Sequence, residues 1–333
     1  MTLNGTGRPG EFELIARYFA PIAGPAGLGL RDDAGLLRPA RGYELVVTAD
    51  ALVAGVHFFA DDPPGSIARK ALGVNLSDLA AKGARPDGFV LTLALPRDWT
   101  ESWLAAFSAG LGEIARDTAC PLVGGDTVMT PGPLTLSITA FGSVPAGRMV
   151  PRTGAKPGDF VIVSGTIGDG ALGLLAHGPD RPAWVAALAE SERAALADRY
   201  LHPQPRLGLA AALQTHASAA MDISDGLVGD LAKLLKASGV GAQIELDAVP
   251  LSAAARAAIM ADPALLELAW TGGDDYEILC MASETEYPAL AAAGDAAGLA
   301  MTIIGRITER NGHVQYREKG RARSFAQGSF THF

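Results

Sequence analysis

The sequence predicts an α/β protein made of two domains. Its 333 residues exceed what one ordinary hydrophobic core organises. Hydrophobic residues make up 49% of the chain and charged residues 19%, a balance typical of folded proteins rather than disordered ones. Strand-like and helical stretches alternate, as in α/β proteins. Because the segment 145–158 is rich in Pro and Gly, we expect one domain over residues 1–150 and another over 151–333.

The first predicted elements lead into a loop and then into a strand. Residues 11–19 have helical apolar spacing, and glycines and prolines break the following stretch, 21–33, into a loop. Residues 43–48 form a β-rich run that is expected to stop near Asp50, and an extended apolar pattern resumes over 52–59. Asp50 is therefore predicted to lie at a strand break.

The next helix is predicted over residues 66–82. Ser66 follows two prolines and suits the N-cap position. Asp78 falls on an apolar stripe of this helix, where an unpaired carboxylate is costly. Asp78 therefore either binds a ligand or forms a salt bridge with Lys82 or Arg85.

In the rest of the chain, β-rich apolar runs predict further strands, and helical apolar spacing predicts further helices. Strands are expected at 89–95, 122–123, 134–144, 160–164, 220–223, 242–246, 276–281 and 301–304. Helices are expected at 101–118, 169–177, 183–200, 205–215, 227–238, 252–261 and 285–297. The alternation in the second half predicts an α/β layer domain.

Charge and cysteine content narrow the class of protein. A net charge of −9 and a pI near 5.2, without a basic cluster, disfavour a nucleic-acid partner. The two cysteines, Cys120 and Cys280, are too few for a disulfide scaffold and are expected to be reduced core residues. Residues 1–10 lack the basic and then apolar pattern of a signal peptide, and no run is apolar enough to span a membrane. We therefore expect a cytoplasmic protein with no membrane partner.

Asp and Gly recur together where predicted strands or helices give way to loops. The positions are Asp32-Asp33, Asp50, Gly124-Gly125-Asp126, the run 222–226 and the run 272–275. Glycine lets the backbone approach a ligand closely, and carboxylate oxygens are preferred ligands of Mg²⁺. The pattern indicates a nucleotide and metal site suited to phosphoryl transfer, which needs no covalent nucleophile.

Each of these features also has a purely structural interpretation. Asp-Gly pairs are common in turns, and Ser224-Asp225-Gly226 could simply be the N-cap of the helix over 227–238. His57 could be a packed core histidine, and Arg152 could be solvated. The sequence has no GxxxxGK[ST] motif, which disfavours a P-loop kinase.

Seven blocks in order closely resemble the thiamine-monophosphate kinase family. The blocks are GEFELIARYF (10–19), TADALVAGVHF (48–58), KALGVNLSDLAAKGARP (70–86), GGDT (124–127), RTGAKPGD (152–159), MDISDGL (221–227) and GGDDYE (272–277). The VNLSDLAAKGA, GGDT and DISDG blocks are shared with the wider PurM-like superfamily, whereas the first two blocks are typical of the thiamine branch.

The resemblance implies a two-domain PurM-like fold and ATP-dependent phosphorylation of thiamine monophosphate to thiamine diphosphate by direct in-line transfer. It also implies a homodimer in which the N-terminal domains pair their mixed sheets. ATP and several Mg²⁺ ions are expected along the acidic cleft of the N-terminal domain, with the C-terminal domain closing over them.

The resemblance also assigns residues. Metal-binding positions match Asp33, Thr48, Asp50, Asp78, Asp126, Asp222 and Asp225. ATP-contacting positions match Gly125, Asp126, Arg152 and Ser224, and thiamine monophosphate positions match His57, Asp274 and Phe330. Asp126, Asp222 and Arg152 are the expected catalytic residues.

The chain departs from the family pattern at Arg31, Ala49 and Asp274, where Gly, a hydroxyl residue and Glu are common, and at the C-terminal SFTHF. Two alternatives stay open at this point. One is a PurM-like enzyme with a different acceptor, and the other is a non-catalytic protein that binds nucleotide or thiamine phosphate.

Overall fold

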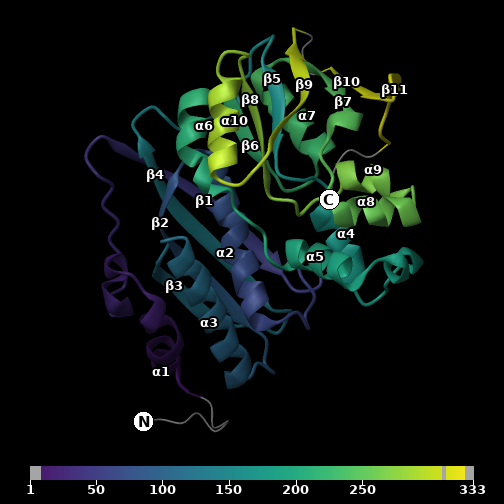
Figure 1. The fold of residues 1–333 in the computed structure, drawn as a ribbon. Helices are drawn as coiled ribbons and strands as arrows, with labels where there is room; N and C mark the ends of the chain where they lie inside the picture. The colour runs from purple at the N-terminus through teal and green to yellow at the C-terminus, as the bar shows by residue number, and fades with distance from the viewer. Residues whose placement is uncertain (1–8, 310–312, 327–333) are drawn as a thin grey trace. The chain divides into compact units, whose positions relative to one another are not determined.

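The computed structural model describes residues 9–309 and 313–326. The chain divides into two compact units (Figure 1). Unit 1 comprises Met1–Leu79 and Arg85–Gly147, and unit 2 comprises Ala80–Ala84 and Arg148–Phe333. Both contain helices and a β-sheet, which confirms the predicted α/β class.

Unit 1 is built on a four-stranded mixed sheet in the order β1-β4-β2-β3. The strands are β1 (Tyr43–Val53), β2 (Arg85–Leu95), β3 (Leu122–Met129) and β4 (Thr135–Pro145). β4 pairs antiparallel with both β1 and β2, while β2 and β3 run parallel. The parallel pair needs a crossover, which α3 (Glu101–Asp117) supplies between β2 and β3.

Three strands of unit 1 (β1, β2 and β3) are longer than predicted, and the differences in β1 and β3 involve site residues. β1 does not stop at Asp50 but continues to Val53, because β4 pairs with it along its whole length. β3 contains Gly124, Gly125 and Asp126, which were expected in a loop, because β2 pairs alongside them. Partner strands override the local loop preference of glycine and aspartate at these positions.

Helical segments complete unit 1. α1 (Glu11–Leu14) continues as a π-helical stretch, η1 (Ile15–Phe19), and the short turns η2 (Ala20–Ile22) and η3 (Pro25–Leu30) follow. α2 runs over Pro64–Ala81, so Ser66 lies in its first turn and is not the N-cap that the sequence indicated. α3 has the side chain of Thr100 as its N-cap, accepting the N–H of Trp103 at 3.1 Å.

Unit 2 carries a seven-stranded sheet in the order β11-β10-β7-β9-β5-β8-β6. The strands are β5 (Phe160–Ser164), β6 (Ala219–Ile223), β7 (Gly241–Glu245), β8 (Glu277–Ala282), β9 (Met301–Thr308), β10 (Val314–Glu318) and β11 (Arg321–Arg323). The last two strands were not predicted. All neighbouring pairs are antiparallel except β10 and β7.

The helices of unit 2 match the predicted ones except in four places. They are α4 (Asp169–His177), η4 (Ala183–Ala187), α5 (Glu190–Leu201), η5 (Leu207–Leu209), α6 (Ala210–His216), α7 (Leu227–Ser238), η6 (Leu246–Ala248), α8 (Ala253–Ala261), α9 (Leu265–Thr271) and α10 (Tyr287–Ala296). The predicted helix over 183–200 is two elements, because Leu188 and Ala189 are extended. The predicted helix over 205–215 begins as the 3₁₀ turn η5, and η6 and α9 were not predicted.

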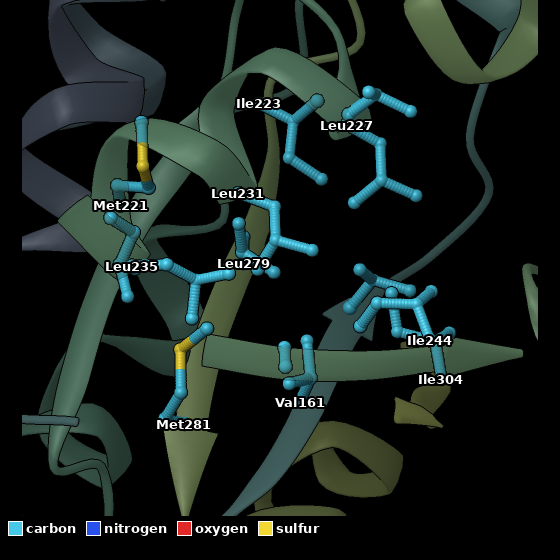
Figure 2. Close-up of a cluster of buried hydrophobic side chains, with 14 of the residues drawn as sticks. Val161, Met221, Ile223, Leu227, Leu231, Leu235, Ile244, Leu279, Met281 and Ile304 are labelled. Carbon is cyan, nitrogen blue, oxygen red and sulfur yellow. The ribbon is translucent and has the colours of Figure 1, made fainter. Parts of the chain in front are cut away.

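Alternating side chains on the strands form a core on each face of the second sheet. Val161 of β5 packs in one cluster with α7, shown with Leu231, Leu235 and Leu279 in Figure 2, whereas Ile162 packs in another with Leu213 and Leu290 of α6 and α10. This two-sided burial is the layer arrangement that the alternation predicted.

Both cysteines are buried and free, as expected for reduced core residues. Burial raises the pKa of each thiol to about 12, so neither is a reactive thiolate near neutral pH. Within the described part of the chain, no helix has the length and hydropathy needed to span a membrane.

Candidate functional site

Unit 1 contains a pocket of about 610 Å³ beside the β3 strand. Its apolar lining comes from the N-terminal helical segment and from the sheet, with Phe12, Ile15, Phe19, Leu91 and Leu122. Its polar lining comes from Arg31, Asp32, Asp33, Gly124, Gly125, Asp126 and Thr127. The pocket therefore combines an apolar wall with carboxylates, and it brings two predicted metal ligands, Asp33 and Asp126, into one cavity.

Glycines let backbone segments approach each other closely at this pocket. A Cβ atom on Gly125 would lie 2.0 Å from the carbonyl oxygen of Leu91, and one on Gly35 would lie 2.4 Å from that of Val123. By contrast, the nearest atom to a Cβ on Gly124 would be 3.5 Å away, an ordinary contact. Gly125 is thus required for the pairing of β3 with β2, which holds Asp126 at the pocket.

A second group of predicted ligands lies where α2 faces β1. The hydroxyl of Thr48 donates a hydrogen bond to the carboxylate of Asp78. The two basic residues considered as salt-bridge partners of Asp78 have contacts elsewhere: Lys82 donates to the carbonyl oxygen of Ala220 at 2.6 Å, and Arg85 pairs with Asp87 at 3.3 Å. Thr48 and Asp78 are thus a hydroxyl and carboxylate pair with oxygens available for one cation.

The two groups of unit 1 lie on different faces of the sheet. Asp50 is aligned with the buried Ile138, on the same side of β1 as Thr48. Asp126 is aligned with the exposed Thr92 and is itself exposed. The residues 33 and 126 therefore form one group and the residues 48, 50 and 78 another.

His57 is half-buried in the turn that follows β1. Its Nδ1 atom accepts the backbone N–H of Val53 at 3.0 Å, so Nδ1 is unprotonated in this arrangement. The opposite ring nitrogen, Nε2, is then the one that carries a proton and can donate. This gives His57 a local structural role without removing its capacity to bind a ligand.

In unit 2, the DISDG run lies between β6 and α7. Asp222 is buried within β6, opposite Ile278.

The backbone N–H groups of Ser224 and Asp225 donate to the carboxylate of Asp230 at 3.0 and 2.9 Å. Burial raises the pKa of the Asp230 carboxyl, against the opposing effect of Lys233, which also forms an ion pair with Asp225. Of the three residues considered as a cap, only Gly226 is the N-cap of α7, without a side-chain hydrogen bond, and Asp230 satisfies the backbone donors of Ser224 and Asp225.

Three predicted site residues remain in the second half of the chain: Arg152, Asp274 and Phe330. Arg152 is exposed, and its carbonyl oxygen accepts a hydrogen bond from the hydroxyl of Ser238 at 2.6 Å. Asp274 is half-buried with φ of 73°, and the hydroxyl of Tyr276 donates to its carboxylate at 3.2 Å. Phe330 lies outside the described residues.

The donor set is chemically suited to Mg²⁺. Across residues 9–309 and 313–326, no group of three or more His, Cys, Asp or Glu side chains could hold a metal ion alone. Mg²⁺ is usually held by one or two carboxylates together with phosphate oxygens of a substrate, so a protein cluster of three is not required. The pairs at Asp33 and Asp126, and at Thr48 and Asp78, supply the oxygen ligands that such binding uses.

Several residues that shape these sites were not singled out from the sequence. The aromatic lining of the pocket comes from Phe12 and Phe19, whose helical apolar spacing predicted a helix but no part in a site. Asp230 and Glu277 are buried acids that organise the loops of unit 2. The signal for Glu277 was its place in the GGDDYE block, but its partners are too distant in sequence to be recognised.

The chain is similar along most of its length to known proteins. Residues 31–144 match the AIR synthase related protein N-terminal domain, and residues 156–317 match the C-terminal domain of the same proteins. The thiamine-monophosphate kinase of Caulobacter vibrioides is 44% identical, over 94% of this chain and 88% of that protein.

Two solved structures have the same fold over most of both chains. The thiamine-monophosphate kinase of Stenotrophomonas maltophilia is 40% identical with a TM-score of 0.78, covering 88% of this chain and 91% of that one. The structure described as AaThiL complexed with AMPPCP and TMP is 30% identical with a TM-score of 0.76, covering 100% and 99%.

A pH-dependent stability follows from the buried Asp275. Burial raises its pKa from 3.8 to about 8, against the hydrogen bonds that its carboxylate accepts from the N–H groups of Gly168 and Gly170. Between these values the folded chain holds a proton that the unfolded chain releases, so the free energy of unfolding should fall as pH rises, by up to about 1.4 kcal/mol per pH unit.

Urea unfolding at several pH values between these limits, for the wild type and Asp275→Asn, isolates this contribution. The slope with pH should be smaller in the variant, because its amide does not titrate. Equal slopes in the two proteins would contradict the assignment.

Proposed function

The chain belongs to the thiamine-monophosphate kinase family, and on that basis we propose that it transfers the γ-phosphoryl group of ATP directly to thiamine monophosphate. The observation that carries the proposal is similarity over the full chain to a structure that holds both AMPPCP, an ATP analogue, and TMP. The pocket of unit 1, with its apolar wall and its acidic and glycine-rich edge, supports it independently.

The pocket of unit 1 is the proposed ATP site. The apolar side chains of Phe12, Ile15 and Phe19 suit an adenine base, which stacks on or packs against such groups. At the other edge, Gly125 leaves the backbone accessible to phosphates and Asp126 lies beside it. The nucleotide would thus lie with its base on the apolar wall and its phosphates toward the carboxylates.

Mg²⁺ is the proposed metal cofactor, held in unit 1 by Asp33, Thr48, Asp50, Asp78 and Asp126, and in unit 2 by Asp222 and Asp225. When bound, Mg²⁺ neutralises phosphate charge and orients the γ-phosphate. The carboxylates would bind the cation. Without the cation, they would repel the negatively charged triphosphate. In unit 2, the ion pair of Lys233 with Asp225 would have to yield to a cation at that position.

The proposed reaction is a direct in-line displacement. A phosphate oxygen of thiamine monophosphate attacks the γ-phosphorus, and the bond from that phosphorus to the oxygen bridging to the β-phosphate breaks. The products are thiamine diphosphate and ADP. The attacking oxygen is already anionic, so no protein base has to remove a proton.

The other assigned residues bind and orient the substrates in this proposal. Arg152 and Ser224 are proposed to contact ATP, with the Arg152 guanidinium placing positive charge at a phosphate. His57, through Nε2, and the carboxylate of Asp274 are proposed to contact thiamine monophosphate, as is Phe330. The cytoplasmic location stays a prediction.

The surface of β1 supports the proposed homodimer. β1 is an edge strand, and alternate side chains on one side of it, Tyr43, Leu45 and Val47, are 43%, 42% and 57% exposed. An edge strand with exposed apolar side chains is a usual site of pairing with another chain. We propose that a second copy of this chain covers it.

The β1 surface gives a direct test of the dimer. Val47→Glu should shift the protein from dimer to monomer in sedimentation velocity, because a charge would be buried against the apolar surface of the partner. Met260→Glu, at an apolar residue of α8 that is 85% exposed, is the control and should leave the dimer intact. A wild-type monomer, or a dimeric Val47→Glu, would contradict the proposal.

The kinase activity is tested by mixing purified protein with ATP, Mg²⁺ and thiamine monophosphate and identifying the product by mass. Thiamine diphosphate and ADP should form in equal amounts. Turnover with another acceptor only would favour a PurM-like enzyme of different specificity, and binding without turnover would favour a non-catalytic relative.

Asp126→Asn should lower kcat/KM by about a hundredfold or more, because it removes one charge from the proposed cation site. Asp98→Asn, at an exposed aspartate outside the pocket, should have no effect. Wild-type activity in Asp126→Asn with its fold intact would contradict the metal assignment.

A further inference from the structure

We propose that a buried ion-pair cluster in unit 2, formed by Glu277, Arg199 and Arg206, is a positioning device for the loop 272–276 and thereby for the carboxylate of Asp274. The proposal rests on the proposed function, which assigns Asp274 to thiamine monophosphate. It adds residues that do not touch the substrate but determine how the loop presents Asp274.

Glu277 is the first residue of β8, and its side chain is fully buried. Its Oε2 atom accepts hydrogen bonds from Nε of Arg206 at 2.7 Å and from the hydroxyl of Ser164 at 2.6 Å. Its Oε1 atom accepts from Nη2 of Arg199 at 2.9 Å and from Nη2 of Arg206. Both carboxylate oxygens are therefore satisfied by two donors each, in a geometry that leaves little freedom.

The two arginines come from different places in unit 2. Arg199 lies in α5, Arg206 lies in the segment that follows it, and their side chains are only 11% and 13% exposed. A Cβ atom on Gly165 would lie 2.4 Å from Oε1 of Glu277, so the cluster also depends on glycine at this position. The cluster thus joins α5, the end of β5 and the start of β8.

A cluster of this kind is poorly explained by stability alone. Buried ion pairs are often no more stabilising than apolar residues of similar volume, because desolvation offsets the attraction. The rest of β8 is fully buried and apolar, so an apolar residue at position 277 would suit the sheet. What the charged cluster supplies instead is a fixed geometry at the point where the loop enters β8.

The cluster is connected directly to the loop. Nη2 of Arg199 also donates to the carbonyl oxygen of Asp275 at 2.8 Å, one residue beyond Asp274. From the other side, the Asp275 carboxylate accepts the N–H groups of Gly168 and Gly170 at 2.7 and 3.0 Å. Asp275 is therefore held through both its main chain and its side chain.

The loop has a conformation that needs such support. Asp274 and Tyr276 have φ of 73° and 53°, a left-handed conformation that is unfavourable for residues with a side chain. Their N–H groups donate to the carbonyl oxygens of Ser224 and Ile223 at 2.9 and 2.8 Å. In this conformation the Tyr276 hydroxyl reaches the Asp274 carboxylate at 3.2 Å and orients it.

The consequence is that loosening the cluster should misplace Asp274 before it unfolds the unit. Arg206→Met removes the guanidinium fork but leaves Glu277 paired with Arg199 and Ser164. Arg206→Lys keeps the charge without the fork, and Tyr276→Phe removes only the hydroxyl that orients Asp274. Leu290→Ala, at a fully buried residue of a different apolar cluster in unit 2, is the control for general loss of stability.

Steady-state kinetics of the four variants with both substrates varied tests the proposal. Arg206→Met and Tyr276→Phe should raise the KM for thiamine monophosphate about tenfold while the KM for ATP stays constant. Arg206→Lys should be intermediate, and Leu290→Ala should lower Tm without changing either KM. The proposal would be overturned if the KM for thiamine monophosphate rose no more in Arg206→Met than in Leu290→Ala. It would also be overturned if Arg206→Met raised the KM values for both substrates equally.

Amide hydrogen exchange supplies a readout that does not depend on activity. Exchange at Asp274 and Tyr276 should be faster in Arg206→Met than in the wild type and in Leu290→Ala. If Arg206→Met does not fold, Arg206→Lys serves in its place. A wild type that does not phosphorylate thiamine monophosphate contradicts the proposed function, whereas unchanged exchange at these two amides contradicts the positioning role.

Discussion

Electrostatic repulsion among the carboxylates of one pocket limits what unit 1 can bind. Asp32, Asp33 and Asp126 line one pocket in a chain of net charge −9, so a bare triphosphate would be repelled there. Thr48 and Asp78 add a second oxygen-rich pair on the other face of the sheet. The backbone pairing that Gly125 permits holds Asp126 at the pocket, and in the proposed function a cation offsets the negative charge of the carboxylates and of the nucleotide.

Three buried acids of unit 2, Asp230, Asp275 and Glu277, are instead held by partners within the protein. Asp230 accepts backbone N–H groups and pairs with Lys233, and Glu277 is surrounded by two arginines and a serine hydroxyl. Asp275 is held by two backbone N–H groups at the start of α4. The partners of Asp230, Asp275 and Glu277 fix the loops that contain or face these acids.

The sequence predicts most of the elements but not the long-range contacts. Periodicity identifies α4 and α7 with their observed bounds and the two sheet-bearing halves. It fails at Asp50 and at Gly124-Gly125-Asp126, because pairing with β4 and β2 keeps residues with loop preferences in strands. It also fails to find the Glu277 cluster, since Arg206 and Ser164 are 71 and 113 residues away in sequence. In the candidate site, the sequence identifies the residue types. It does not show that Asp126 and Asp50 lie on different faces of the sheet, because that depends on strand register.

Calorimetry can test whether the carboxylates of the pocket require a cation, by titrating the protein with AMPPCP in the presence of Mg²⁺ and in the presence of EDTA at matched ionic strength. Because carboxylates line the proposed nucleotide pocket, we expect the analogue to bind with Mg²⁺ and binding to be lost, or to be weaker by orders of magnitude, in EDTA. Equal affinity under the two conditions would show that the triphosphate binds beside these carboxylates without a cation, and would contradict the proposed role of Mg²⁺.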